Sequence, residues 1–336
     1  MDSDTELVAR TVEADQVDRG LLHALQLDPR LPFSRIAEVL DVSDQTIARR
    51  YRRLRAAGVV QVVALPNPWR IGHSPWFVRL RCIPDAAADI AEALARRPDT
   101  GWVYLLSGGA EIDCTVLPVQ PTEDSVLLQR LTRTSRVVAV TAHSMLQIFA
   151  GSEYSVLGPV LDEQQVAAVC ESRVEGLRGS AFSGAPTRLE PADRALVDVL
   201  GRDARAPLAE LARVTGWSES HVRRRLEWLL SSGTVFFEVD IDPAQIGLRM
   251  KARLWITAAP DALASVGEAI SYHPEVPFVA ATTGPTNLVA SAYCRDPGAF
   301  YDYLTARLGA LPGIRHIETA PIVRTLKRAG RPAPDR

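Results

Sequence analysis

The stretch VDRGLLHALQLDPRLPFSRIAEVLDVSDQTIARRYRRL at residues 17–54 decides the fold, because it returns as ADRALVDVLGRDARAPLAELARVTGWSESHVRRRLEWL at residues 192–229. The offset between the two stretches is a constant 175 residues without a gap, and the correspondence continues to Gly72 and Gly247. The retained residues include Asp18 and Asp193, Arg30 and Arg205, Ser43 and Ser218, Arg50 and Arg225, and Leu54 and Leu229. A repeat of this period indicates two copies of a whole multidomain unit rather than a solenoid of small repeats.

The composition is that of an ordinary globular protein, with 336 residues, 47% hydrophobic and 23% charged. The longest apolar runs are too short to cross a bilayer, and the first sixteen residues are acidic without an apolar core. We therefore expect a cytoplasmic protein with no membrane partner. The four cysteines stand at least 32 positions apart and the six histidines are scattered, so neither a metal nor a cofactor is expected.

The first half of each copy predicts three helices. In the first copy the apolar residues of Asp18–Leu27 form a helical stripe, and Ser34 is a plausible N-cap for a second short helix. A short break, Asp41-Val42-Ser43, precedes a third helix that runs to about Ala57, with Gly58 suited to its end. A short helix, a turn and a basic helix form the helix-turn-helix pattern, which binds double-stranded DNA through the major groove.

The third helix has an apolar side and a basic side. Ile47, Tyr51 and Leu54 share the apolar side, while arginine, glutamine and threonine on the other side suit base edges and phosphates. A solvated charged face is the alternative interpretation. The residues predicted to contact DNA are Ser43, Gln45, Thr46, Arg49, Arg50, Arg52 and Arg53 in the first copy and Ser218, Ser220, His221, Arg224 and Arg225 in the second.

The two basic helices are not equal. Glu227 stands where the first copy has Arg52, and Trp228 replaces Arg53. Residues 18–57 hold eight arginines and five acidic residues, whereas residues 193–232 hold seven arginines and six acidic residues. The two helices are therefore not expected to favour identical DNA sequences.

The second half of each copy predicts strands and helices in the order β-α-β-β-α-β. The ranges in the first copy are 76–83, 85–96, 102–107, 112–117, 122–133 and 137–148, and those in the second are 251–258, 261–272, 278–283, 288–294, 298–308 and 314–326. This order indicates a split βαβ unit with helices on one face of an antiparallel sheet. The uncovered apolar face is expected to pair with a second such sheet, within one chain or between the two chains of a homodimer, which we favour.

These motifs resemble the leucine-responsive/AsnC (Lrp/AsnC) family of transcriptional regulators, present here as a tandem fusion. The resemblance rests on Thr46-Ile47, Arg50-Tyr51, Arg53-Leu54 and Gly58-Val59-Val60, and on Asp242-Pro243-Ala244-Gln245-Ile246-Gly247. It implies a sequence-specific DNA-binding regulator, controlled by an amino acid or another small-molecule effector.

The resemblance also implies an effector-sensing loop of the pattern Gly-x-x-Asp between the second and third strands of each sensing domain. In this chain the aspartate is replaced by Glu111 and Asn287. A glycine turn in a hairpin is more often geometry than ligand chemistry. The candidate effector-binding residues are Gly108, Gly109, Glu111, Gly284, Thr286 and Asn287.

The predicted fold class is α+β, with two winged helix-turn-helix domains alternating with two ferredoxin-like βαββαβ sensing domains. The helix-turn-helix domains span 17–65 and 191–240, the sensing domains 66–150 and 241–328, a linker 151–190, and tails 1–16 and 329–336. A helix is predicted at 162–174, and the N-terminal part of the linker is expected to dock on the first sensing domain.

Two other functions remain open at this point. Siroheme decarboxylases resemble the same family and also occur as fused pairs, but their His-Cys-Tyr and Trp-Pro-Tyr-Asn stretches are replaced here by residues 97–102 and 273–278. A regulator that no longer binds DNA and acts as a partner scaffold is the other alternative. No P-loop, GxGxxG or GxSxG pattern occurs in the sequence, so we expect no enzyme and no catalytic residue.

Overall fold

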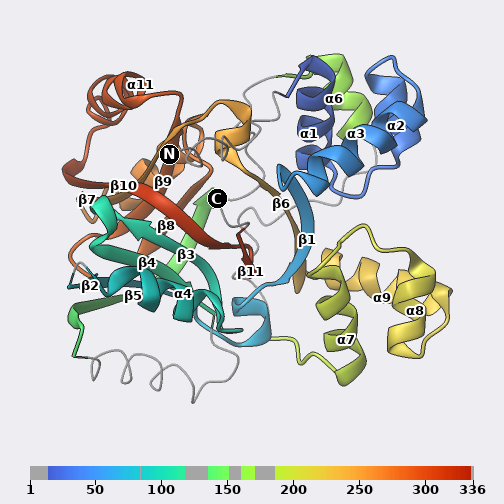
Figure 1. Ribbon diagram of the computed structural model, residues 1–336, viewed down its shortest axis with the longest axis horizontal. Coiled ribbons are helices and arrows are strands. Elements are labelled where there is room, and N and C mark those ends of the chain that lie inside the picture. Colours follow the sequence, from blue (N-terminus) through green and yellow to red (C-terminus); the bar gives the residue numbers. More distant parts are fainter. Residues whose placement is uncertain (1–13, 84, 118–134, 151–159, 171–185, 334–336) are drawn as a thin grey trace, which may run out of the picture.

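The computed structural model describes residues 14–83, 85–117, 135–150, 160–170 and 186–333. Two three-helix units lie on one side of the molecule and a body of two sheets lies on the other (Figure 1). A two-stranded ribbon joins the two helical units. Among the described residues, no helix has the length and apolar character needed to span a membrane.

The first three-helix unit contains α1 (Gln16–Leu27), α2 (Phe33–Val39) and α3 (Asp44–Ala56). The Asp15 side chain accepts a hydrogen bond from the backbone N–H of Asp18 and caps α1. Pro32 precedes α2, so Ser34, which we expected to be the N-cap, lies inside the helix. The second unit repeats this arrangement with α7 (Pro191–Leu200), α8 (Leu208–Thr215) and α9 (Glu219–Ser231).

The ribbon is built from the strand that follows each three-helix unit. β1 (Val60–Pro66) pairs antiparallel with β6 (Val235–Ile241), and Val63 lies opposite Glu238. Each strand therefore pairs with its counterpart from the other copy. One continuous apolar core runs through both helical units and the ribbon, and its fully buried members include Leu21, Leu25, Ile47, Leu54, Leu196, Leu200 and Leu229.

The body contains eight long strands in two sheets. The first copy contributes β2 (Trp76–Cys82), β3 (Thr100–Leu106), β4 (Glu111–Val116) and β5 (Val137–Ala150). The second copy contributes β7 (Met250–Ala258), β8 (Phe278–Thr282), β9 (Leu288–Cys294) and β10 (Ile314–Arg328), and the short β11 (Arg331–Pro332) lies beside β10. The predicted strand order is confirmed in both copies.

Strands β5 and β10 belong to both sheets. β5 pairs with β2 up to Ser144 and with β8 from Met145 onward. β10 pairs with β7 up to Pro321 and with β3 from Ile322 onward. The sheets therefore close on each other, and the predicted sheet pairing forms within one chain rather than between the two chains of the homodimer that we favoured. Association of two chains stays a prediction.

Helices cover the outer face of each sheet. α4 (Ala87–Ala95) packs on the first sheet, while α10 (Leu263–Ser271) and α11 (Pro297–Asp302), extended by a π-helical turn Tyr303–Leu308, pack on the second. Single 3-10 turns occur at Trp69–Ile71, Ser107–Gly109 and Pro243–Ile246. The helix expected at 122–133 lies outside the described residues.

The linker helix α6 (Glu163–Cys170) packs on the first three-helix unit, beside α1 and α2. The backbone N–H of Leu161 donates to His23 Nδ1 at 3.1 Å, and Gln165 Nε2 donates to the carbonyl of Val39 at 2.9 Å. Leu161 and Val169 are buried in the core of that unit. Residues 160–170 therefore dock on the helical unit and not on the sensing domain as expected, because their apolar residues enter the helical core, while residues 151–159 lie outside the described residues.

We predict that α6 undocks as the pH falls. Burial lowers the pKa of His23, and its Nδ1 accepts a hydrogen bond, so the ring is neutral when folded. An unperturbed histidine has a pKa of 6.5. The stabilisation is therefore complete above that pH and is lost below it, by at most about 1.4 kcal/mol per pH unit. Thermal unfolding between pH ~7 and ~5 should show a steeper loss of Tm for the wild type than for His23→Asn, which keeps an acceptor without titrating. Equal slopes would contradict this role.

Candidate nucleic-acid interface

Helix α3 presents a basic face away from the core. Its apolar side is buried through Ile47 and Leu54, whereas Gln45, Arg49 and Arg52 are exposed. Arg52 Nε donates to the carbonyl of Ala48 in its own helix. These three side chains lie on the outer, polar side of the helix.

The beginning of α3 is fixed by a cap. Ser43 Oγ accepts a hydrogen bond from the backbone N–H of Thr46 at 3.2 Å, and the two hydroxyl groups lie 2.8 Å apart. Ser43 is exposed and Thr46 is half-buried. Both predicted contact residues therefore have a structural role at the helix N-terminus, where backbone N–H groups suit a phosphate.

Arg50 and Arg53 of the same helix bind a buried carboxylate. Arg50 Nη1 donates to Asp18 at 2.9 Å and to Asp15 at 2.7 Å, and Arg53 also forms an ion pair with Asp18. Asp18 is completely buried, and the hydrogen bonds to Asp15 and Asp18 raise the pKa of Arg50. Arg50, predicted to contact DNA, therefore holds α3 against α1, and its contact with DNA stays a prediction.

The second copy repeats this pair. Arg225 donates from Nε and Nη2 to the two carboxylate oxygens of Asp193, both at 2.7 Å, and Asp193 is completely buried. The prediction missed the two aspartates as partners. Their signal was in the repeat, because Asp18 and Arg50 return together as Asp193 and Arg225.

Helix α9 presents a different surface. Arg224, Ser220 and His221 are exposed, and Ser218 caps the helix by accepting from the backbone N–H of His221 at 3.3 Å. The His221 ring stacks on Trp217, with centroids 4.5 Å apart.

Further along α9, the side chains that replace basic residues of α3 are also exposed. Trp228 lies under the guanidinium of Arg225, 4.4 Å from ring centroid to carbon, and Glu227 is exposed on the outer side. The second basic helix therefore offers an aromatic ring and a carboxylate where the first offers arginines.

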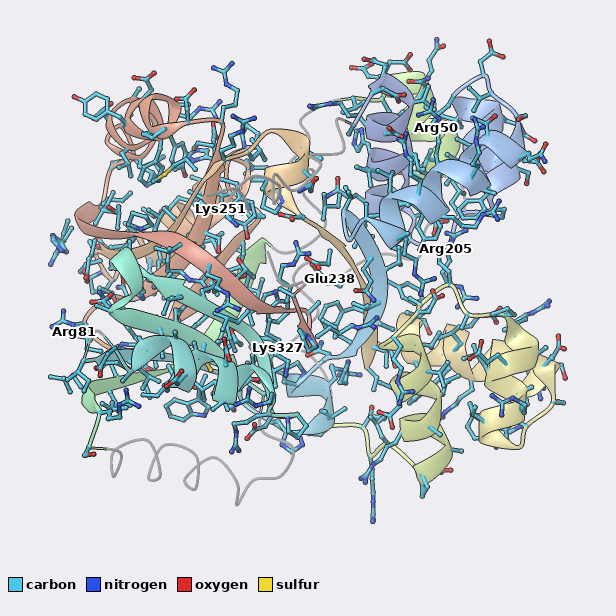
Figure 2. All side chains as sticks on the ribbon, viewed as in Figure 1. Arg50, Arg81, Arg205, Glu238, Lys251 and Lys327 are labelled. Carbon is cyan, nitrogen blue, oxygen red and sulfur yellow. The ribbon has the colours of Figure 1, made fainter. Side chains whose placement is uncertain are left out.

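The two three-helix units are locked together by reciprocal arginines. Arg30 donates to the carbonyls of Ala204 at 2.8 Å and Ala206 at 3.5 Å. Arg205 lies between the two units (Figure 2) and donates to the carbonyls of Pro29 at 2.8 Å and Leu31 at 2.9 Å. Because the two arginines occupy equivalent positions of the repeat, the contact follows a local two-fold relation, and it fixes α3 relative to α9.

The two candidate effector loops are engaged with their own domains. Arg79 Nη2 donates to Glu111 at 2.8 Å, and Arg81 Nε donates to it at 3.3 Å. The Asn287 amide pairs with the backbone of Ala258, accepting at 2.8 Å and donating at 2.9 Å. The polar side chains that the sequence suggested for an effector thus hold neighbouring strands.

The glycines of these loops have backbone conformations that favour glycine. Gly108, Gly109 and Gly284 have φ values of 69°, 93° and 103°. A Cβ atom on Gly284 would lie 2.0 Å from Nδ1 of His143, so this loop also needs glycine for close packing. The half-buried Thr286 contributes its carbonyl, which accepts from Thr282 Oγ1 at 3.1 Å. Among the residues that the structure describes, no cluster of metal-ligating side chains occurs.

Known families match this architecture. The AsnC-type helix-turn-helix domain matches residues 15–55 and 191–230, and the Lrp/AsnC ligand binding domain matches residues 251–332. The HTH-type transcriptional regulator FL11 of Pyrococcus horikoshii is 27% identical over 140 residues, which cover 41% of this chain and 92% of that protein. An uncharacterized HTH-type transcriptional regulator of the same organism is 31% identical over 123 residues, which cover 35% of this chain and 78% of that protein.

The similarity to solved structures of a siroheme decarboxylase extends along nearly the whole chain. The crystal structure of the siroheme decarboxylase NirDL has a TM-score of 0.62 and 14% sequence identity, and the match covers 96% of this chain and 95% of that chain. At this identity the likeness concerns the fold, and it shows that the tandem arrangement occurs in another protein. With two AsnC-type helix-turn-helix domains and an Lrp/AsnC ligand binding domain, the chain belongs to the Lrp/AsnC family.

Proposed function

We propose that the chain is a sequence-specific DNA-binding transcriptional regulator in which one chain supplies both recognition helices. The observation that carries the proposal is the fixed pair of α3 and α9, each with free basic side chains on its outer face. Arg49 and Arg52 on α3 and Arg224 on α9 are exposed, and reciprocal hydrogen bonds from Arg30 and Arg205 join the units. Paired helix-turn-helix units bind half-sites that lie about one helical turn, or multiples of it, apart.

The two half-sites of the proposed operator differ in sequence. Helix α3 exposes Arg49, Arg52 and Gln45. Helix α9 exposes Arg223, Arg224 and the stacked His221, but it carries the acidic Glu227 where α3 has Arg52. Arginine favours guanine edges and phosphates, and a carboxylate is repelled by the DNA backbone. The first half-site therefore supplies more of the binding free energy.

The ligand-binding domains supply the proposed control. The match to the Lrp/AsnC ligand binding domain supports an amino acid or another small molecule as the effector. Because the polar loop side chains Glu111 and Asn287 hold neighbouring strands, an effector would act by competing with those contacts. DNA affinity measured with and without each amino acid tests this control.

A decarboxylase acting on an iron tetrapyrrole is the second candidate, and the full-length likeness to NirDL favours it. In the segments that replace the decarboxylase motifs, residues 97–102 and 273–278, these side chains are engaged internally. Arg97 donates to both oxygens of Asp99 at 2.7 and 2.6 Å, and His273 Nδ1 lies 3.1 Å from the Tyr303 hydroxyl. We therefore favour the regulator.

We predict that titration with an iron uroporphyrin produces no saturable change in the Soret absorbance of the purified protein. In the segments 97–102 and 273–278, Arg97 is paired with Asp99, and His273 Nδ1 lies at hydrogen-bond distance from the Tyr303 hydroxyl. A stoichiometric Soret shift that His273→Ala abolishes would contradict the regulator and support the enzyme.

Separate arginines on α3 should have separate effects. Arg49→Ala with Arg52→Ala should weaken DNA binding by ~1–3 kcal/mol for each lost base contact, or reduce the salt slope by about one for each lost phosphate contact. The Tm should stay nearly unchanged, because both side chains are exposed. Arg50→Ala should instead lower stability by ~1–3 kcal/mol, because it removes a partner of the buried Asp18. The measurements are gel shifts and thermal unfolding.

Arg224→Ala is the matched control on α9, and a larger affinity loss there would contradict the asymmetry.

Replacing Glu227 by arginine should tighten DNA binding. Glu227 is exposed on the outer side of α9, at the position equivalent to Arg52. Removing one negative charge and adding one positive charge should make the salt dependence of log K steeper by about one. Glu227→Gln should give a smaller gain. Unchanged affinity in both variants would mean that α9 does not approach DNA.

A further inference from the structure

The inner faces of the two sheets meet through unlike residues at equivalent positions. This interface is mainly apolar and includes Phe77, Tyr104, Met145, Trp255, Val289 and Ile322. Two arginines, Arg79 on β2 and Arg253 on β7, lie among these residues and are largely buried, with side-chain exposures of 15% and 3%.

Strand register shows that Arg79 is equivalent to Trp255. Arg79 pairs with Asp113, the second residue after Glu111, with which β4 begins. Trp255 pairs with Val289, the second residue after Asn287, and Asn287 is the second-copy equivalent of Glu111. The two positions therefore match in the two copies.

The same register makes Phe77 equivalent to Arg253. Phe77 pairs with Thr115 on β4, and Arg253 pairs with Ser291 on β9, in each case two residues further from the loop. At both positions one copy has an arginine and the other has an aromatic residue.

These equivalent residues contact each other across the interface. The guanidinium carbon of Arg79 lies 4.0 Å from the centroid of the Trp255 ring, and that of Arg253 lies 5.5 Å from the Phe77 ring. Cations over aromatic faces are attractive, and more so when water is excluded. In one pair the first copy supplies the arginine, and in the other pair the second copy does. Each copy therefore offers an aromatic ring to the arginine of the other.

Each arginine also binds a carboxylate that the other copy contributes. Arg79 Nη2 lies 2.6 Å from Glu318 Oε1 on β10, and Arg253 Nε lies 2.5 Å from Asp113 Oδ2 on β4. Both arginines are thereby neutralised across the interface rather than only within their own sheet.

If two chains paired through the sheets of their first copies, these contacts would be lost. Arg79 would face a second Arg79 instead of Trp255. Glu318 on β10 pairs with Trp255, and Thr141 on β5 pairs with Arg79. Thr141 is therefore the first-copy equivalent of Glu318 and offers no carboxylate. Two partly desolvated guanidinium groups would meet without the carboxylate that crosses the interface, which is strongly unfavourable.

Pairing of two second copies has the same defect. Arg253 would face a second Arg253 instead of Phe77, and Val289 would stand in the place of Asp113. A fully buried arginine would then have neither an aromatic face nor a carboxylate opposite it.

We propose that each ligand-binding domain carries an interaction surface that accepts the other half of this chain and excludes a second copy of itself. The partner is the chemically complementary sheet, with an aromatic residue opposite each arginine and a carboxylate opposite each guanidinium. One consequence is that the two different recognition helices are always brought together. The proposal concerns the pairing of the sheets and holds whether or not the chain binds DNA.

The test reproduces the contact of a self-pair inside the full chain. Trp255→Arg places an arginine opposite Arg79, and Trp255→Leu removes the aromatic ring without adding charge. Thermal unfolding should show that Trp255→Arg lowers the Tm by on the order of 5 °C more than Trp255→Leu does. Equal Tm values for the two variants would overturn the proposal.

An exchange variant keeps the test informative if Trp255→Arg does not fold. The double variant Arg79→Trp with Trp255→Arg restores one arginine and one tryptophan, and residue 255 lies beside Glu318 on the neighbouring strand. It should recover at least half of the Tm lost in Trp255→Arg, or restore folding. An exchange variant no more stable than Trp255→Arg would show that pairing does not depend on these unlike contacts.

Discussion

The sharing of strands β5 and β10 between two sheets is the constraint on which the rest of the structure depends. Each strand completes its hydrogen bonds with one sheet up to a switch point, at Ser144 or Pro321, and with the other sheet beyond it. Proline lacks a backbone donor and is suited to a position where the pairing partner changes. Neither sheet has its full set of neighbours without the other copy, so the two copies form one body.

The ribbon and the helical units follow from this closure. β1 and β6 run together because the domains that follow them are already joined, and the apolar core of the helical units is continuous through the ribbon. Arg30 and Arg205 add hydrogen bonds to carbonyls of the opposite unit. The separation and orientation of α3 and α9 are therefore properties of the folded chain, and differences between the two helices become differences between two halves of one binding surface.

Local elements could be predicted from the sequence, because periodicity and caps are local. The helix expected between the break at Asp41-Val42-Ser43 and Ala57 is α3, and β9 has the predicted bounds, whereas the predicted cap Ser34 lies inside α2. Contacts between distant residues could not be predicted in the same way. Arg50 lies in a basic run typical of a DNA-binding helix, and only the position of Asp18 in the folded unit reveals its structural role.

The same limit explains the linker and the sheet pairing. The pattern of residues 162–174 indicated a helix, and no local signal specified that Leu161 would bind His23 of the first helical unit. Sheet pairing was expected from the uncovered apolar faces, but whether it formed within one chain depended on interdomain geometry. The unlike pairs Arg79 with Trp255 and Arg253 with Phe77 become visible only when strand register aligns the two copies.

The most direct measurement is a hydroxyl-radical footprint of the full chain on DNA selected from random sequence. We expect two protected segments of different sequence, separated by about one helical turn or a multiple of it, with one chain bound per pair of segments. Two identical segments in inverted repeat, or a second chain needed to protect the second segment, would contradict the central claim that one chain carries two unlike recognition helices in a fixed arrangement.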